Sequence, residues 1–146
     1  MAKTWKDDQV SLDPIKNQTI AVIGYGIQGN AQANNLKDSG LKVIVGLKEG
    51  GESWKKAQSD GHKVMKIAEA CKAADIIHVL IPDMLQAKIY REEIEPNLGA
   101  GKALSFSHGA AIYWDWIKAP NNLDIIMVAP KGPGSKVRET YLEGYV

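Results

Sequence analysis

Three glycines in the stretch AVIGYGIQGNAQ, residues 21–32, constrain the fold of this chain more than any other feature. Gly24, Gly26 and Gly29 follow a short β-branched run, residues 19–24, and open a helical stretch of small residues, residues 28–37. A strand, a glycine-rich turn and a helix in that order are typical of an α/β protein.

Each glycine has a physical reason for its place if the loop binds a dinucleotide. Gly24 permits the tight turn from strand to helix, Gly26 lets the backbone approach a pyrophosphate, and Gly29 lets the helix pack closely on the strand. The helix N-terminus adds unpaired N–H groups and a partial positive charge. The same glycines could form a structural turn in another α/β protein, but the flanking strand and helix favour the dinucleotide.

Apolar runs alternate with helical stretches along the rest of the chain. Four further runs are apolar on both alternations, which indicates strands covered on both faces. They occupy residues 42–47, 75–82, 102–107 and 123–130. Helical stretches occupy residues 28–37, 54–59, 66–74, 83–94, 113–118 and 135–142. The alternation predicts one α/β domain, residues 1–146, with a Rossmann-type doubly wound, mainly parallel sheet and helices on both faces.

Several helix ends carry their own signals. Gly40 follows the first helix as a C-terminal cap, and Ser53 precedes another helix as an N-cap. Asp83 and Gln86 are three residues apart at the start of a third helix, which is a variant of the capping box.

Composition and charge exclude several classes of partner. The 146 residues are 45% hydrophobic and 24% charged, and 18 basic against 17 acidic residues give a net charge of +1. This balance gives no reason to expect nucleic acid or an anionic membrane as partner. No signal peptide or membrane-spanning run is recognisable. Cys71 is the single cysteine and is expected to be reduced and buried, so we expect a cytoplasmic protein.

The choice between NADP and NAD depends on the loop after the second strand. An NAD site usually has an acidic residue about twenty residues beyond the glycine loop. Here Lys48 comes first, and Ser53 follows at a helix start, a pair that suits a 2′-phosphate. Glu49 and Glu52 could instead bind the ribose of NAD. We therefore expect NADP and leave NAD open.

Of the three histidines, one is placed for chemistry. His62 lies in a turn, where we expect it to be exposed, and His78 lies inside a strand, where a hydrogen-bonded structural role is expected. His108 follows the carboxyl end of the fourth strand, where doubly wound folds bind their ligands. An imidazole there can donate or accept a proton near neutral pH.

The sequence VAPKGPGSKVR, like His108, follows the carboxyl end of a strand, in this case the last one. Its prolines and glycines form a stiff turn that presents Lys131, either as a solvated side chain or as an anion or substrate contact. The loop lacks the spacing of a P-loop. No set of residues has the spacing of a metal site, because the acidic residues near both Asp13 and Glu93 read as surface.

Five segments together resemble the N-terminal half of ketol-acid reductoisomerases. They are GYGIQGNAQANNLKDSG, VGLKEGGESWKKA, IPDMLQAKIY, FSHGAAI and MVAPKGPGSKVRETYLEG. The resemblance begins near Asp13 and runs to the last residue. It implies an NADPH-dependent oxidoreductase of valine, leucine and isoleucine synthesis. Its substrates are the 2-hydroxy-3-keto acids 2-acetolactate and 2-aceto-2-hydroxybutyrate, which a magnesium-assisted alkyl shift and a reduction convert to 2,3-dihydroxy acids.

The resemblance also implies roles for individual residues. His108 and Lys131 match catalytic positions, and the remaining matched positions bind the cofactor. Those that line its phosphates are Tyr25, Gly26, Ile27 and Gln28, and Gly24 and Gly29 shape the same cofactor-binding loop. Those that read the 2′-phosphate are Lys48, Gly51 and Ser53, although the family often has serine in place of Gly51. Those that border the adenosine and nicotinamide ends are Asp83, Met84, Leu85, Gln86 and Gly134.

The family is longer than this chain and forms homo-oligomers. The resemblance implies a further helical domain that carries the magnesium carboxylates and the dimer interface, neither of which we expect here. The ending YLEGYV lacks a cap or a polar tail, as a truncated chain would. We expect the chain alone to bind cofactor but not to catalyse. The alternatives are a stand-alone dinucleotide-binding module and a generic NAD-dependent dehydrogenase domain.

Overall fold

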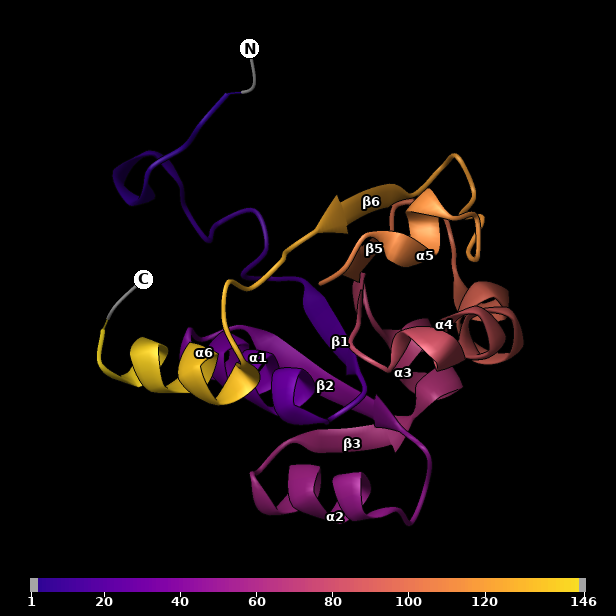
Figure 1. Ribbon diagram of the computed structural model, residues 1–146, viewed down its shortest axis with the longest axis horizontal. Coiled ribbons are helices and arrows are strands. Elements are labelled where there is room, and N and C mark those ends of the chain that lie inside the picture. Colours follow the sequence, from indigo (N-terminus) through magenta and orange to yellow (C-terminus); the bar gives the residue numbers. More distant parts are fainter. Residues whose placement is uncertain (1–2, 145–146) are drawn as a thin grey trace.

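The computed structural model describes residues 3–144, in which six parallel strands form one sheet (Figure 1). The strands are β1 (Thr19–Ile23), β2 (Lys42–Leu47), β3 (Lys63–Lys66), β4 (Ile76–Val79), β5 (Ala103–Phe106) and β6 (Asp124–Met127). Their order in the sheet is β3-β2-β1-β4-β5-β6, which is the doubly wound order of dinucleotide-binding folds. The predicted fold class is confirmed. The outermost residues, on which the expectations about a leader and a truncated end partly depend, lie outside the described range.

Helices cover both faces of this sheet. They are α1 (Ile27–Asp38), α2 (Glu52–Ser59), α3 (Ile67–Ala73), α4 (Asp83–Ile89), α5 (Ala110–Tyr113) and α6 (Gly134–Leu142). Short helical turns are η1 (Asp7–Gln9), η2 (Tyr90–Ile94) and η3 (Glu95–Asn97). One hydrophobic cluster joins the sheet to α3, η2 and α5, and a second joins it to α1 and α2. None of the described helices is both long and apolar enough to cross a membrane.

Helix α6 does not cover the sheet directly but lies beside α1 (Figure 1). Asn35 on α1 donates from Nδ2 to the carbonyl of Val137, and Arg138 donates to Oδ1 of the same Asn35. Arg138 also pairs with Asp38. These contacts bring the end of the described chain back to the helix that follows the glycine loop.

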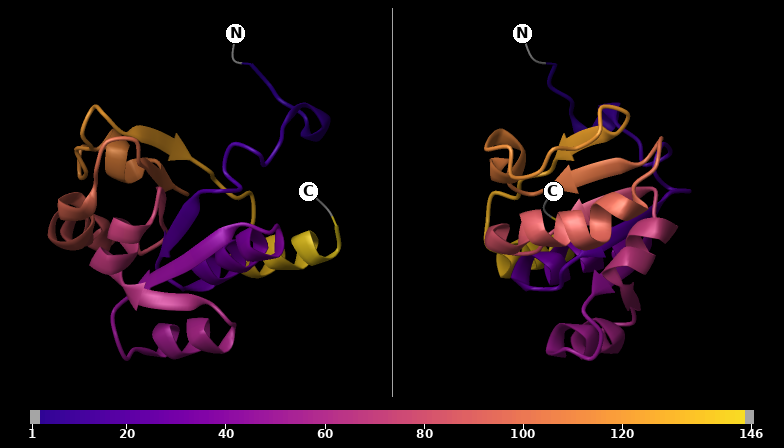
Figure 2. Two further views of the ribbon diagram at one scale, coloured as in Figure 1. Left: turned by 180° about the vertical axis from the view of Figure 1, so that it is seen from behind. Right: turned by 90° about the vertical axis from the view of Figure 1, so that its right-hand side faces the viewer.

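The edge strands depart from the expectation of cover on both faces. All four residues of β6 are exposed among the described residues, Met127 to 61%, because β6 has a neighbour on one side only and receives little helix cover. Strand β3, at the opposite end of the sheet (Figure 2), was not expected. Its sequence KVMK is short and has a lysine at each end, a composition typical of edge strands.

Three local expectations need correction, and one is confirmed. Helix α5 ends at Tyr113 instead of beginning there, because Asp115 has a positive φ of 55° that reverses the chain. His62 is buried, not exposed, because its ring packs edge to face against Tyr25 and its Nε2 bonds to Asn34 Oδ1. The first residue of α2 is Glu52, so Gly51 and not Ser53 is the N-cap. Gly40 ends α1 with a positive φ of 81°, as predicted.

The buried environment of Cys71 confirms its prediction as a small hydrophobic residue. The side chain has no exposed surface, and burial raises the pKa of its thiol to about 12. A thiol held protonated is a poor nucleophile.

Candidate dinucleotide-binding site

The glycine loop has the geometry that its spacing predicts. Gly24 has a φ of 102°, and a Cβ there would lie 2.8 Å from the carbonyl oxygen of Leu80 on the neighbouring strand end. A Cβ at Gly29 would lie 2.3 Å from the carbonyl oxygen of Gly24. The turn and the close approach of helix to strand, both predicted from the sequence, are confirmed.

Gly26 differs from the other two because its surroundings are open. It is the exposed N-cap of α1, and an added Cβ would meet no atom within 4 Å. The amide of Asn30 donates to the Gly26 carbonyl over 2.8 Å, so the N–H groups of the turn before it have no partner within the helix. Those groups and the helix dipole form a cradle that fits a phosphate.

The side chain of Tyr25 points away from this cradle. It is 5% exposed, and its hydroxyl donates to Asp60 Oδ2 over 2.9 Å and accepts from Asn34. Burial and the nearby Asp60 raise the pKa of Tyr25. The ring also meets the His62 ring edge to face. Only the backbone of Tyr25 remains for the cofactor phosphates, as the prediction requires.

The loop between β2 and α2 presents its polar groups to solvent. Lys48 is the first residue after β2, as predicted, and Lys48, Gly51 and Ser53 are all exposed. Gly51 has extended backbone at the N-cap, and the Ser53 hydroxyl lies in the first turn of α2. A cation and a helix N-terminus therefore lie in one loop, a combination that suits a 2′-phosphate.

The carboxylate of Glu49 in the same loop already has a cationic partner. Its Oε2 lies 2.9 Å from Lys66 Nζ at the end of β3, and this contact raises the pKa of Lys66. Glu49 was one of two candidates for the ribose of NAD. The ion pair competes with that role, although both side chains are exposed and the pair is weak.

The first turn of α4 places the predicted adenosine contacts at the same sheet edge. Asp83, Met84 and Leu85 are exposed, Met84 to 88%. Gln86 is buried, and its Nε2 donates to Asp83 Oδ1 over 3.0 Å and to the Ile81 carbonyl. The N-cap of α4 is the preceding proline, so the expected capping box is wrong, although its two side chains do pair.

His108 lies in the segment just after β5, as predicted. Its Nδ1 is 3.8 Å from Asp83 Oδ2 and 3.4 Å from the amide nitrogen of Ala110. The imidazole is exposed, so it can exchange protons with solvent or with a ligand. The structure thus brings His108 next to the predicted adenosine contacts on α4.

The loop after β6 returns to the glycine loop and carries Lys131. The Gly132 carbonyl accepts a hydrogen bond from Gln28 Nε2 over 2.9 Å. Gly134 begins α6 against the first turn of α1, where its Cα is close to the Ile27 carbonyl. Lys131 is exposed. The predicted residues from five separate loops therefore lie along one edge of the sheet.

A set of polar side chains at this edge is joined by hydrogen bonds that the sequence did not predict. His78 was expected to be hydrogen-bonded inside its strand, and it is, to Ser105 and Gln32. Gln32 also bonds to Gln28 and to Ser107. The available signal was the spacing of four between the two glutamines, which places them on one helix face.

The described residues hold no evident metal site. Between residues 3 and 144, no group of three or more His, Cys, Asp or Glu side chains is arranged to bind an ion. The magnesium of the resembled family therefore has no ligand set among these residues.

Known proteins resemble this chain along nearly its whole length. A family model described as the NADPH-binding domain of acetohydroxy acid isomeroreductase matches residues 14–146. Relatives from Cenarchaeum symbiosum and Nitrosopumilus maritimus, each named ketol-acid reductoisomerase (NADP(+)), are 75% identical over 145 residues. These matches cover 99% of this chain but 44% of each relative, so the chain spans less than half of their length.

A solved structure is similar as well. It is that of an NADH-preferring ketol-acid reductoisomerase from an uncultured archean. The superposition has a TM-score of 0.91 at 48% identity and covers 94% of this chain and 43% of that one.

Proposed function

This chain belongs to the acetohydroxy acid isomeroreductase family as its NADPH-binding domain, and we propose that it binds NADPH for a ketol-acid reductoisomerase reaction. The reaction is proposed for a whole protein, of which this chain is the cofactor-binding part, in the cytoplasm. Its substrate is 2-acetolactate or 2-aceto-2-hydroxybutyrate, and its product is a 2,3-dihydroxy acid. Bound NADPH supplies the hydride for the reduction.

The observation that carries the proposal is the exposed, open Gly26 between two glycines that the backbone requires. Gly24 and Gly29 cannot carry a Cβ without meeting backbone atoms, whereas Gly26 is open on its solvent side. The backbone of residues 25–29 would hold the pyrophosphate there. Gly134, packed on α1, would border the nicotinamide end.

The preference for NADPH follows from Lys48 and Ser53. Their cation and hydroxyl would bind the 2′-phosphate at the N-terminus of α2. An alternative preference for NADH has one specific observation in its favour, since the similar solved structure is of an NADH-preferring enzyme. The pairing of Glu49 with Lys66 favours NADPH, because it partly neutralises the carboxylate that would repel a 2′-phosphate.

His108 and Lys131 would act on the substrate. Exposed His108 lies beside Asp83, where its imidazole can hold or release a proton at a bound substrate. Lys131 presents a cation to an acidic substrate from a loop stiffened by prolines on both sides. Neither role involves magnesium, for which residues 3–144 form no ligand set.

A titration of the purified chain with NADPH and, in parallel, with NADH tests cofactor binding. Saturable binding that favours NADPH supports the proposal, and no binding of either cofactor contradicts it. A chimera that joins this chain to the remaining part of the Nitrosopumilus maritimus relative tests the reaction. Oxidation of NADPH that depends on 2-acetolactate supports the reductoisomerase, whereas binding without turnover in a folded chimera favours a stand-alone binding module.

A further inference from the structure

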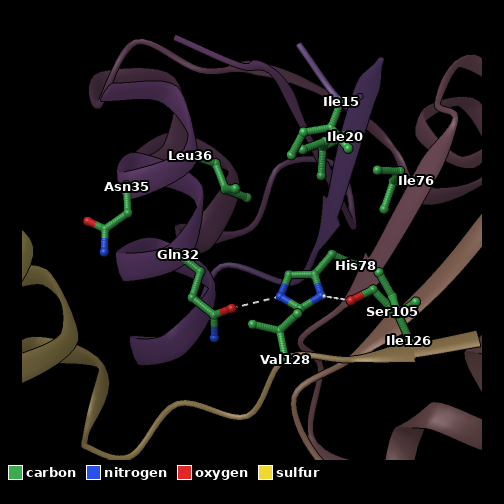
Figure 3. Close-up of a pocket in the computed structure, with 10 residues that line it drawn as sticks. All are labelled: Ile15, Ile20, Gln32, Asn35, Leu36, Ile76, His78, Ser105, Ile126 and Val128. Carbon is green, nitrogen blue, oxygen red and sulfur yellow. Dashed lines mark hydrogen bonds between the residues drawn. The ribbon is translucent and has the colours of Figure 1, made fainter. Parts of the chain in front are cut away.

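A chain of hydrogen bonds begins inside the sheet at two neighbouring strands. His78 on β4 is in register with Ser105 on β5, and His78 Nδ1 lies 2.8 Å from Ser105 Oγ. His78 Nε2 lies 2.7 Å from Gln32 Oε1 on α1 (Figure 3). His78 and Ser105 are 5% and 2% exposed. The imidazole therefore joins a buried strand to the helix that follows the glycine loop.

The same chain continues from Gln32 to the sheet edge. Gln32 Nε2 donates to Gln28 Oε1 over 3.1 Å and to Ser107 Oγ over 3.2 Å. Gln28 Nε2 then donates to the carbonyl of Gly132 over 2.9 Å. The side chains thus tie together α1, the residue before His108 and the loop that carries Lys131.

The Gly132 carbonyl is the last acceptor in this chain of hydrogen bonds, and it sets the direction of every other bond in it. A backbone carbonyl can only accept, so Gln28 must present its amide nitrogen to Gly132 and its oxygen to Gln32. Gln32 must then donate to Gln28 and accept from His78. His78 carries its proton on Nε2, and its Nδ1 accepts from the Ser105 hydroxyl. One arrangement of protons satisfies all the members.

The surroundings of this chain are apolar. Gln32, His78 and Ser105 line a cavity of about 270 Å³ whose other walls are mostly aliphatic (Figure 3). Those aliphatic residues are Ile15, Ile20, Leu36, Ile76, Ile126 and Val128. In an apolar setting a polar group that loses its partner is not readily compensated, so the members hold one another in place.

We propose that Gln32 and His78 are positioning residues of the cofactor site. They hold Gln28 and, through it, the Gly132 carbonyl, so that the loop carrying Lys131 stays against the glycine loop. The inference rests on the proposed function, because it assigns the loop a place beside bound NADPH. Neither residue is itself a predicted cofactor contact, but Gln32 bonds to Gln28, which is one, so both act through Gln28.

Three variants test whether these hydrogen bonds hold the loop that carries Lys131. Gln28→Met and Gln32→Met keep side-chain length but cannot hydrogen-bond, and Gln58→Met makes the same change at an exposed position on α2. Backbone amide exchange at residues 131–137 is measured on the chain without cofactor. We expect exchange at least about tenfold faster in the two chain variants and unchanged in the control. The double variant Gln28→Met/Gln32→Met should show the same exchange rate as either single variant, because each of them breaks the same connection.

The tautomer of His78 separates positioning from general loss of structure. Nitrogen NMR should show the proton on Nε2 in the wild type and in the control Gln58→Met, in which the Gly132 carbonyl still sets the direction of the bonds. Gln32→Met should lose that single tautomer. Exchange at residues 131–137 that is the same in Gln28→Met as in the control, or that adds up in the double variant, would overturn the proposal.

Cofactor affinity completes the test with a variant that lies away from the cofactor. Gln32→Met should weaken NADPH binding by about three- to tenfold, and Gln58→Met should not. Unchanged affinity in Gln32→Met with faster loop exchange would show that the loop has no part in binding and would overturn the positioning role. If the wild type binds no NADPH, the proposed function fails. The exchange and tautomer results still decide whether the chain of hydrogen bonds holds the loop that carries Lys131.

Discussion

Gly134 lies so close to Ile27 that a Cβ at position 134 would stand 2.3 Å from the Ile27 carbonyl oxygen. The obstructing atoms are mainly backbone of the first turn of α1, which is fixed by the glycine loop on its other side. This contact joins the start of α6 to the predicted cofactor cradle. Any side chain at position 134 must move one of the two helices.

Replacement of Gly134 by alanine should therefore separate α6 from α1. Overpacking against backbone typically costs about 1–3 kcal/mol, so we expect the free energy of unfolding in urea to fall by that amount. Gly132→Ala is a matched control in the same loop, because its added Cβ would come no closer than 4.0 Å to its nearest neighbour, Lys136. Equal stability of the two variants would contradict the close contact.

Removal of Lys48 and Ser53 together should change cofactor preference. Hydrogen bonds to charged groups contribute about 1.5–3 kcal/mol, so Lys48→Ala/Ser53→Ala should weaken NADPH binding at least about tenfold and NADH binding much less. Lys55→Ala removes an exposed cation from α2 outside the loop and serves as control. Equal losses for NADPH and NADH in a calorimetric titration would refute the phosphate-reading role.

Lys66 should influence the same preference from outside the loop. Lys66→Gln leaves Glu49 without its partner, and the freed carboxylate would repel a 2′-phosphate. An exposed pair is worth less than about 1 kcal/mol, so we expect the ratio of NADPH to NADH affinity to fall about two- to fivefold. The Lys66 change should have no effect on the ratio in a Glu49→Gln background. A persisting effect would mean that Lys66 binds the cofactor directly.

The parts of this fold that the sequence could predict are those encoded by consecutive residues. The turn at Gly24 and the close packing at Gly29 depend on a strand, a loop and a helix that are adjacent in the chain. Lys48 and His108 were placed correctly because they are the first and the second residue after an apolar strand. Parallel strands then bring their carboxyl ends to one edge, whatever the loops contain.

The parts that could not be predicted depend on neighbours that are distant in the chain. Strand β3 has too few apolar residues to be recognised alone, and it is held by its pairing with β2. The burial of His62 depends on Tyr25 and Asn34, which lie far earlier in the chain. The bonds of Gln28 to Gly132 and of Gln32 to His78 span 104 and 46 residues, so no local pattern indicates them.

His108 should affect turnover and leave cofactor binding unchanged. His108→Asn keeps a polar side chain but removes the imidazole that would transfer a proton to or from the substrate. In the chimera described above we expect NADPH affinity within about twofold of the parent and turnover reduced by about 10²–10⁴, the usual contribution of a general acid or base. Retained turnover would reduce His108 to a structural residue.

His78 should make the stability of the chain sensitive to acid. Burial lowers its pKa from 6.5 to about 4, so between these values the unfolded chain takes up a proton that the folded chain does not. The contribution of His78 to the free energy of unfolding is therefore fully present above pH 6.5 and falls as the pH drops toward 4. This lowering of the pKa corresponds to a loss of about 3 kcal/mol in the free energy of unfolding.

The variant His78→Gln isolates this contribution to the pH dependence. It has no group that titrates in this range, and its amide can still donate to Gln32. Burial lowers the pKa of His62 as well, but His62 is present in both proteins, so its effect cancels in the difference. Urea unfolding at pH 7, 5.5 and 4 should show the wild type losing about 3 kcal/mol more than the variant. Parallel losses would mean that the pKa of His78 is the same in the folded and the unfolded chain, which would contradict the effect of its burial.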